Sequence, residues 1–395
     1  MTLLLIVIYV TFISLGLPDS LFGVAWPLAH VDFGLPESFG SVYSVLTAIC
    51  SGGISFFAGS LIKKFGTGIV TAVSVVMTAV GLLIISFAPN IYVMMLGSII
   101  AGLGGGAIDT GLNNFVSVRY KAIHMNWLHC FWGVGVTVSP VIMSFFLKDG
   151  AWKSGYRTIS YVQFGIAVLV FLSLILWKKY DKRESEKKEA VAENAEFETK
   201  TEKLGLKKIL LSPGVITAIL SLGFYCTVEF IMGTWGASYL INARGMTADK
   251  AAQMVAFYYG GIMLGRFLSG ILSLKLNDRV LIRGGACVLL FGVVMLAIPN
   301  IVTLYMGMIA IGVGCGPIFP STLHAVPERF GKEASTYLTG YHMGGAYVVG
   351  FSVQVIFGYV APATTFGIMP YVLIVFTAIM LLMVELTNKK AKEIV

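Results

Sequence analysis

The segments GLGGGAIDTGLNNFVSVRY (Gly102–Tyr120) and GVGCGPIFPSTLHAVPERF (Gly312–Phe330) stand 210 residues apart and repeat one pattern. The shared positions are three glycines, an isoleucine and an arginine: Gly102/Gly312, Gly104/Gly314, Gly106/Gly316, Ile108/Ile318 and Arg119/Arg329. The same offset pairs Asp19 with Glu229 and Gly23 with Gly233. Because a repeat at one fixed offset indicates a duplicated unit, the sequence predicts two related halves.

Composition indicates a membrane protein, since 57% of the 395 residues are hydrophobic and only 12% are charged. A transmembrane helix needs about 20 mostly apolar residues, and such runs recur along the chain. We predict an all-α polytopic membrane protein with twelve spans, at 3–30, 38–62, 68–88, 91–117, 123–147, 157–178, 213–241, 250–273, 280–298, 300–323, 335–360 and 366–387. The first span lacks a basic leader and a cleavage site, so we expect it to be retained.

The six-and-six division predicts two pseudo-symmetric bundles, over residues 1–178 and 213–395, joined by a linker over residues 179–212. That linker carries nearly balanced charges, which is typical of a solvated helix or a disordered segment. A regulatory role for it stays open.

Most lysines and arginines fall in the linker or in alternate short loops, and the excess of such residues marks cytoplasmic loops. This pattern predicts cytoplasmic termini for a multi-pass plasma-membrane protein, and the short loops suggest a prokaryotic inner membrane. The net charge of +8 is then a topology signal, so we expect the lipid bilayer, and no nucleic acid, as a partner.

Three acids, Asp19, Asp109 and Glu229, lie inside apolar spans. A charge at the bilayer centre costs about 3 kcal/mol on insertion scales, so such residues usually face a cavity, a substrate or a cation. These three residues therefore favour transport as the function.

Further polar side chains share helix faces with these acids. Asp109 and Asn113 are four residues apart, and Asn126 and His129 are three apart, so each pair presents one polar face. Amides and carboxylates can replace the water shell of a hydroxyl-rich solute. Aromatic side chains could wall such a site or anchor helix ends at the membrane surface; they are Trp26, Trp127, Trp132, Trp235, Tyr258, Tyr259 and Tyr341. His129 and His342, which pair loosely in the repeat, are candidates for binding or for packing.

The stretch Gly59-Ser-Leu61-Ile-Lys63-Lys64-Phe-Gly66 resembles the G-x-L-a-D-r-x-G motif of the major facilitator superfamily, with Lys63 at the usual Asp position. The resemblance implies that superfamily's fold and its movement by alternating access. It also implies gating roles for Lys63, Lys64 and Arg266, the last in the counterpart Gly265-Arg266-Phe-Leu-Ser-Gly270. Arg266 lies near the cytoplasmic end of its predicted span, which favours a gating or snorkelling role over substrate binding.

Within that superfamily, three stretches resemble fucose and glucose/galactose permease-like sugar:cation symporters. They are Gly106-Ala-Ile-Asp109-Thr-Gly-Leu-Asn113-Asn114, followed by His124-Met-Asn126-Trp127-Leu-His129-Cys-Phe-Trp132-Gly, and Leu17-Pro18-Asp19-Ser20. The resemblance implies that Asp19 binds sugar and that Asp109 takes the coupling proton. The substrate-binding set we expect is Asp19, Asn113, Asn126, Trp127, His129, Glu229, Tyr259 and His342.

We thus expect a monomeric secondary transporter that imports a sugar with a cation, a proton in preference to sodium. It should need no cofactor and no metal, since the five cysteines lack ligand spacing. An enzyme is disfavoured because no HExxH or nucleophile-elbow motif occurs. Two alternatives stay open: a drug or lipid efflux antiporter, whose helix-5 signature only Ser139-Pro140-Val-Ile partly matches, and a non-transporting nutrient receptor.

Overall fold

The computed structural model describes residues 2–120, 122–178, 213–330 and 332–391, and this part of the chain folds entirely into helices, turns and short loops. Twelve of its segments are long and apolar enough to cross a membrane. The twelve predicted spans and the all-α class are therefore confirmed. The predicted linker lies outside the described residues.

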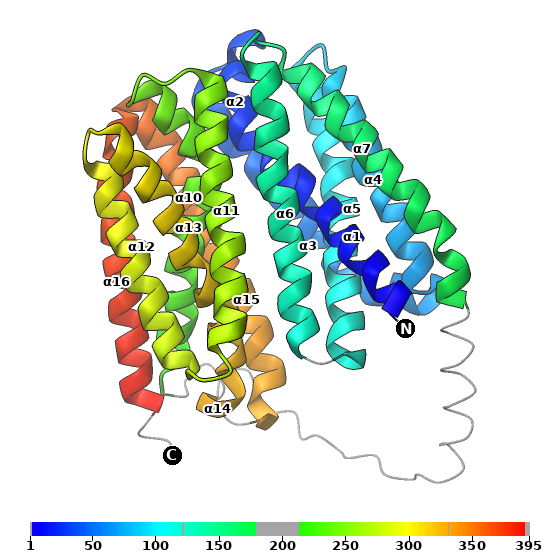
Figure 1. Cartoon of the computed structure of the whole chain (residues 1–395), viewed down its shortest axis with the longest axis vertical. Coiled ribbons are helices and arrows are strands. Elements are labelled where there is room, and N and C mark those ends of the chain that lie inside the picture. The colour runs from blue at the N-terminus through cyan, green and yellow to red at the C-terminus, as the bar shows by residue number, and fades with distance from the viewer. Residues whose placement is uncertain (1, 121, 179–212, 331, 392–395) are drawn as a thin grey trace.

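One bundle contains α1 (Thr2–Asp19), α2 (Leu21–Asp32), η1 (Glu37–Phe39), α3 (Gly40–Phe65), α4 (Thr67–Ser86), α5 (Ile91–Arg119), α6 (Ala122–Leu147) and α7 (Trp152–Leu172). The other contains α10 (Val215–Asn242), α11 (Ala248–Leu272), α12 (Asp278–Ala297), α13 (Ile301–His324), α14 (Val326–Phe330), α15 (Lys332–Ala363), η2 (Phe366–Ile368) and α16 (Met369–Ala391). The bundles stand side by side, with the start of α1 and the end of α16 at the same end of the molecule (Figure 1).

The repeated glycines are points where helices touch backbone to backbone. A Cβ at Gly106 of α5 would clash with the Ser51 carbonyl of α3, and a Cβ at Gly316 of α13 would clash with the Gly265 backbone of α11. Small residues allow such close approach in lipid, where no hydrophobic effect draws helices together. Within their own bundles, Gly104, Gly312 and Gly314 make similarly close backbone contacts, and Gly102 makes a looser one, with its Cβ position 3.2 Å from the Thr47 carbonyl.

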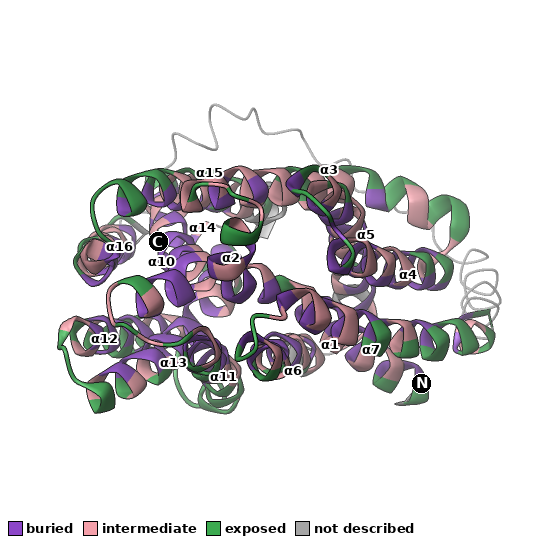
Figure 2. Ribbon diagram, turned by 90° about the horizontal axis from the view of Figure 1, so that it is seen from above, coloured by how far each residue is buried: buried purple, intermediate pink, exposed green. Residues whose placement is uncertain are grey.

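The two bundles meet along three helix pairs. Viewed from above, α3 lies beside α15, α6 beside α11, and α2 beside α10 (Figure 2). At the last pair the repeat-related glycines meet, because a Cβ at Gly23 would clash with the Gly233 carbonyl. Near the end of the molecule opposite the termini, Ser41 Oγ donates to the Val355 carbonyl at 3.2 Å, and Asn242 Nδ2 donates to the Glu37 carboxylate at 3.2 Å. Hydrogen bonds between the bundles thus close that end.

We predict that Gly316→Ala lowers stability by about 1–3 kcal/mol, because the added methyl must push α13 away from α11 and packed interiors resist such overfilling. Thermal unfolding in detergent measures the effect. The control is Gly284→Ala on α12, where a Cβ would meet nothing within 4 Å; equal melting temperatures for the two variants would contradict the assignment.

Candidate functional site

The first predicted span is present, and a single turn residue interrupts its helix, a feature that the sequence did not reveal. The helix α1 ends at Asp19, and α2 begins at Leu21 after the single turn residue Ser20. Pro18 has no N–H, so the Ser14 carbonyl one turn earlier loses its helical donor. In lipid, every such group needs another partner.

Side chains from α6 and α7 supply these partners. Gln163 Nε2 donates to the Ser14 carbonyl at 2.9 Å and lies 2.8 Å from Thr78 Oγ1. Ser139 Oγ donates to the Leu17 carbonyl, the next group exposed by the break. Both Gln163 and Ser139 are fully buried, so they hold the interrupted helix in place. The sequence shows through Pro18 that the Ser14 carbonyl lacks its helical donor. It does not show which side chains donate in place of the missing N–H.

Asp19 stands at the end of α1, immediately before the break. Its side chain is exposed although it lies within an apolar span, and its Oδ2 accepts a hydrogen bond from Trp132 Nε1 of α6 at 2.7 Å. Close packing sets this pair, because Cβ atoms at Gly16 and Gly135 would clash with the facing backbones of α6 and α1. The result is a carboxylate at the edge of a fixed indole ring.

Arg266 connects this pair to the other bundle. Its guanidinium lies over the Trp132 ring, 4.6 Å from the ring centroid, and its Nη2 lies 3.8 Å from Glu229 Oε1 of α10. Asp19 and Glu229, which the repeat relates, are therefore linked through an indole and a guanidinium. The side chain of Arg266 is thus directed toward Glu229 and the Trp132 ring.

Asp109 lies on α5 and is partly buried. Asn113 Nδ2 donates to Asp109 Oδ1 at 2.7 Å, one helical turn away. Charges on Asp19 and Arg266 are close enough to act electrostatically on Asp109. The structure thus gathers the three intramembrane acids and one arginine between the bundles.

Three further predicted residues differ in their burial and in their neighbours. Tyr259 is buried with its hydroxyl beside Gly233, and His129 meets Phe12 edge to face, with ring centroids 6.0 Å apart. Trp127 is 49% exposed. The side chain of Asn126 lies outside the described part of the structure.

Three predicted residues have other surroundings. His342 is buried and bonds through Nδ1 to the Leu338 carbonyl of its own helix at 2.9 Å, so the structure does not bring it to Asp19. Lys63 and Lys64 are exposed at the end of α3, and Lys64 Nζ lies 5.2 Å from the centroid of the Phe65 ring.

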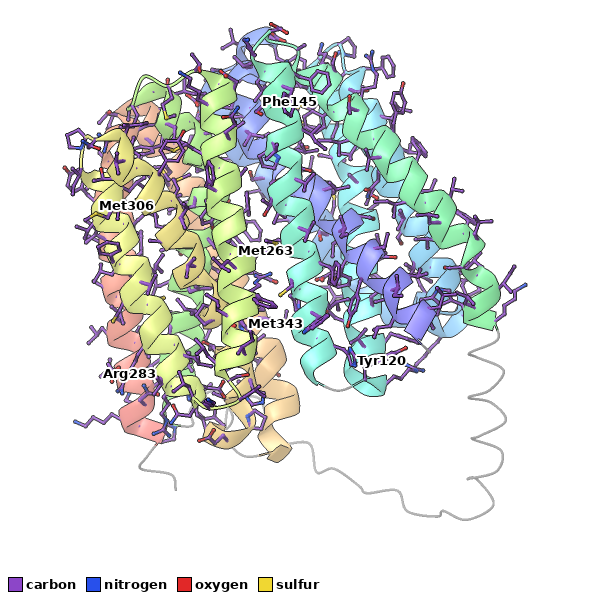
Figure 3. The ribbon with its side chains drawn as sticks, viewed as in Figure 1. Tyr120, Phe145, Met263, Arg283, Met306 and Met343 are labelled. Atoms are coloured by element: carbon purple, nitrogen blue, oxygen red, sulfur yellow. The ribbon has the colours of Figure 1, made fainter. Side chains whose placement is uncertain are left out.

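The α6–α11 boundary beside Trp132 and Arg266 is tightly packed. A Cβ at Gly133 would lie 2.8 Å from Met263 Cβ, and Figure 3 labels Met263 on α11, on the side that faces α6. No group of three or more His, Cys, Asp or Glu that could hold a metal occurs among the described residues. The groups gathered here, which are carboxylates, an amide, a guanidinium and an indole, are of the kinds that form hydrogen bonds and ring contacts with polar solutes.

A family model described as Major Facilitator Superfamily matches residues 8–355. Among curated proteins, Bypass of stop codon protein 6 of Saccharomyces cerevisiae is 22% identical over 63% of this chain and 55% of its own length, so the chain spans little more than half of that relative. The glucose/mannose transporter GlcP of Bacillus subtilis is 23% identical over 74% of each chain. Efflux pump DEP3 of Fusarium langsethiae is 30% identical over 31% of this chain and 23% of its own.

Two solved structures share the fold. A bacterial homolog of the human lysosomal transporter Spinster, inward-facing and unoccupied, has a TM-score of 0.69 at 10% identity and is matched over 99% of this chain and 97% of its own. The fucose:proton symporter FucP of E. coli has a TM-score of 0.62 at 14% identity, over 98% of each chain.

We predict that Gln163→Leu destabilises the protein by about 1–3 kcal/mol, because it leaves the Ser14 carbonyl buried without a donor. Thermal unfolding in detergent again provides the measurement. Gln253→Leu on the exposed face of α11 is the matched control. If both variants melt at the wild-type temperature, Gln163 does not hold the break.

Proposed function

The chain belongs to the Major Facilitator Superfamily, and on that premise we propose that it imports a sugar by proton-coupled symport. The two bundles would rock about the central residues in alternating access, as duplicated transporters of this class do. One chain would form the whole pathway as a monomer in the plasma membrane, with both termini in the cytoplasm.

The observation that carries the proposal is the exposed Asp19 carboxylate at the edge of the Trp132 ring, 2.7 Å from the indole nitrogen. A carboxylate can accept two hydroxyl hydrogen bonds, and a flat aromatic face suits the C–H face of a sugar ring. The amide of Asn113 and the hydroxyl of Tyr259 add polar contacts of the same kind. GlcP and FucP, named as a glucose/mannose transporter and a fucose:proton symporter, support a sugar as the solute.

Asp109 is the proposed proton site. Its hydrogen-bond donor is the Asn113 amide on its own helix, which leaves the other carboxylate oxygen free to hold a proton. A sodium ion would prefer several oxygen ligands around it, as hard cations do, and the described residues contain no group of three or more carboxylate, His or Cys side chains close enough to hold one ion. The proton is therefore the favoured coupling ion.

The conformation agrees with a state that opens toward the end where the termini lie. The hydrogen bonds from Ser41 and Asn242 join the bundles near the opposite end. In this proposal Lys63, Lys64 and Arg266 belong to the gates that alternate between the two sides.

Efflux of an amphipathic compound is the second candidate. It is supported by the match to efflux pump DEP3. This relative is 30% identical, against 23% for GlcP, but the match covers only 31% of this chain. Three acids and an arginine between the bundles fit a hydroxyl-rich solute better than an apolar one, since an apolar ligand would leave these groups unpaired. A transport assay separates the two functions.

We predict that Asp109→Asn in proteoliposomes retains sugar counterflow but loses accumulation under an inwardly directed proton gradient. The amide cannot take up and release the proton, although it can still bond Asn113. Radiolabelled d-glucose, d-mannose and l-fucose are the probes, and Asp149→Asn in an exposed loop is the control. Movement of a dye or lipid, without any sugar, would establish efflux instead, and accumulation driven only by sodium would refute proton coupling.

We predict that Asp19→Asn raises the half-saturating sugar concentration for counterflow at least about tenfold, because hydrogen bonds to a charged group contribute roughly 1.5–3 kcal/mol. Asp32→Asn is a matched control, since Asp32 accepts from Trp152 Nε1 at 2.6 Å in an equivalent Trp–Asp pair outside the site. An unchanged half-saturating concentration in Asp19→Asn would exclude Asp19 as a sugar ligand.

A further inference from the structure

We propose that Arg266 covers the face of Trp132 to which the sugar ring binds, so that a neutral pyranose must displace the guanidinium to enter the site. The inference rests on the proposed sugar transport. In this inference Arg266 competes with the sugar for the Trp132 face and is not itself a sugar ligand. The site would then prefer neutral sugars over sugar acids.

The first step of the argument is geometric. A sugar held by Asp19 must lie beside Trp132, because the indole N–H is 2.7 Å from the Asp19 carboxylate. The guanidinium of Arg266 lies over that same ring, 4.6 Å from its centroid. Trp132 otherwise packs against apolar core residues. Moving the Arg266 side chain would therefore uncover a fixed aromatic face beside a carboxylate.

The second step concerns how firmly Arg266 is held. Its backbone is fixed, because a Cβ at Gly316 would lie 2.6 Å from the Arg266 nitrogen. Its side chain is long and its Nη2 lies 3.8 Å from Glu229 Oε1, beyond hydrogen-bond range. The guanidinium is held by charge attraction to Glu229 and by its contact with the Trp132 ring. Neither interaction fixes its orientation, so the Arg266 side chain can change rotamer and still have Glu229 as its counter-ion.

The third step concerns charge. Glu229 pairs with Arg266, Asp109 interacts with its charge, and Asp19 bonds the same Trp132 ring that the guanidinium covers. Three acids against one arginine leave no surplus positive charge for a carboxylate ligand. A planar cation suits the indole face by cation–π attraction, whereas the C–H face of a neutral pyranose suits it without adding charge. A sugar acid would be repelled.

A double-mutant cycle tests the competition, because removing Arg266 alone would leave Glu229 unpaired. We would measure the half-saturating concentration for counterflow of d-glucose, d-mannose and l-fucose in wild type, Arg266→Gln, Glu229→Gln and the double variant. In the Glu229→Gln background we expect Arg266→Gln to lower that concentration at least about threefold, which corresponds to the loss of a partly desolvated cation–π contact.

The opposite sign would overturn the proposal. If Arg266→Gln raises the half-saturating concentration in that background or leaves it unchanged, Arg266 is a sugar ligand or a structural residue. Melting temperatures of the four proteins check that folding is preserved. Competition by d-glucuronate as strong as that by d-glucose would refute the preference for neutral sugars. If the wild type moves none of the three sugars, the proposed transport has failed and the inference falls with it.

Discussion

The rest of this structure depends on how the broken first helix satisfies its backbone in lipid. Pro18 removes the donor for the Ser14 carbonyl, and Gln163 replaces it at 2.9 Å. Ser139 serves the Leu17 carbonyl in the same way. Irregular backbone survives at membrane depth only where protein groups or a water-filled cavity replace the missing bonds. Because α6 and α7 supply them, the break can stand between the bundles and hold Asp19 there.

Close glycine contacts give this arrangement its precision. Contacts at Gly16 and Gly135 press α1 against α6, which sets Asp19 against Trp132, and the Gly316 contact fixes the backbone of Arg266. The repeat places equivalent glycines in both bundles, so each bundle is rigid inside. Between the bundles, Gly23 meets Gly233 on the first helix of each half. Rigid bodies joined at small residues can rock while the groups between them change partners, which is the motion alternating access requires.

The polar groups between the bundles form one connected set. Glu229, Arg266, Trp132 and Asp19 follow one another across the boundary through an ion pair, a ring contact and a hydrogen bond. A ligand that engages any of these groups alters the contacts of the next. In the proposed function, binding in this site would thereby be coupled to the relative position of the bundles.

The sequence by itself determined the twelve spans, the all-helical class, the family and the three intramembrane acids. The length of the apolar runs, the spacing of the repeat and the position of acids within those runs can all be read from the order of the residues. It also predicted that Asp109 and Asn113 share one helix face, on which the structure places a hydrogen bond between them. Only the tertiary structure decided that the first span breaks after Asp19, that Gln163 and Ser139 stabilise the break, and that Arg266 turns inward to Trp132 and Glu229. These contacts join residues more than 30 positions apart on different helices, and helical periodicity sets which face a residue occupies, not which distant side chain meets it.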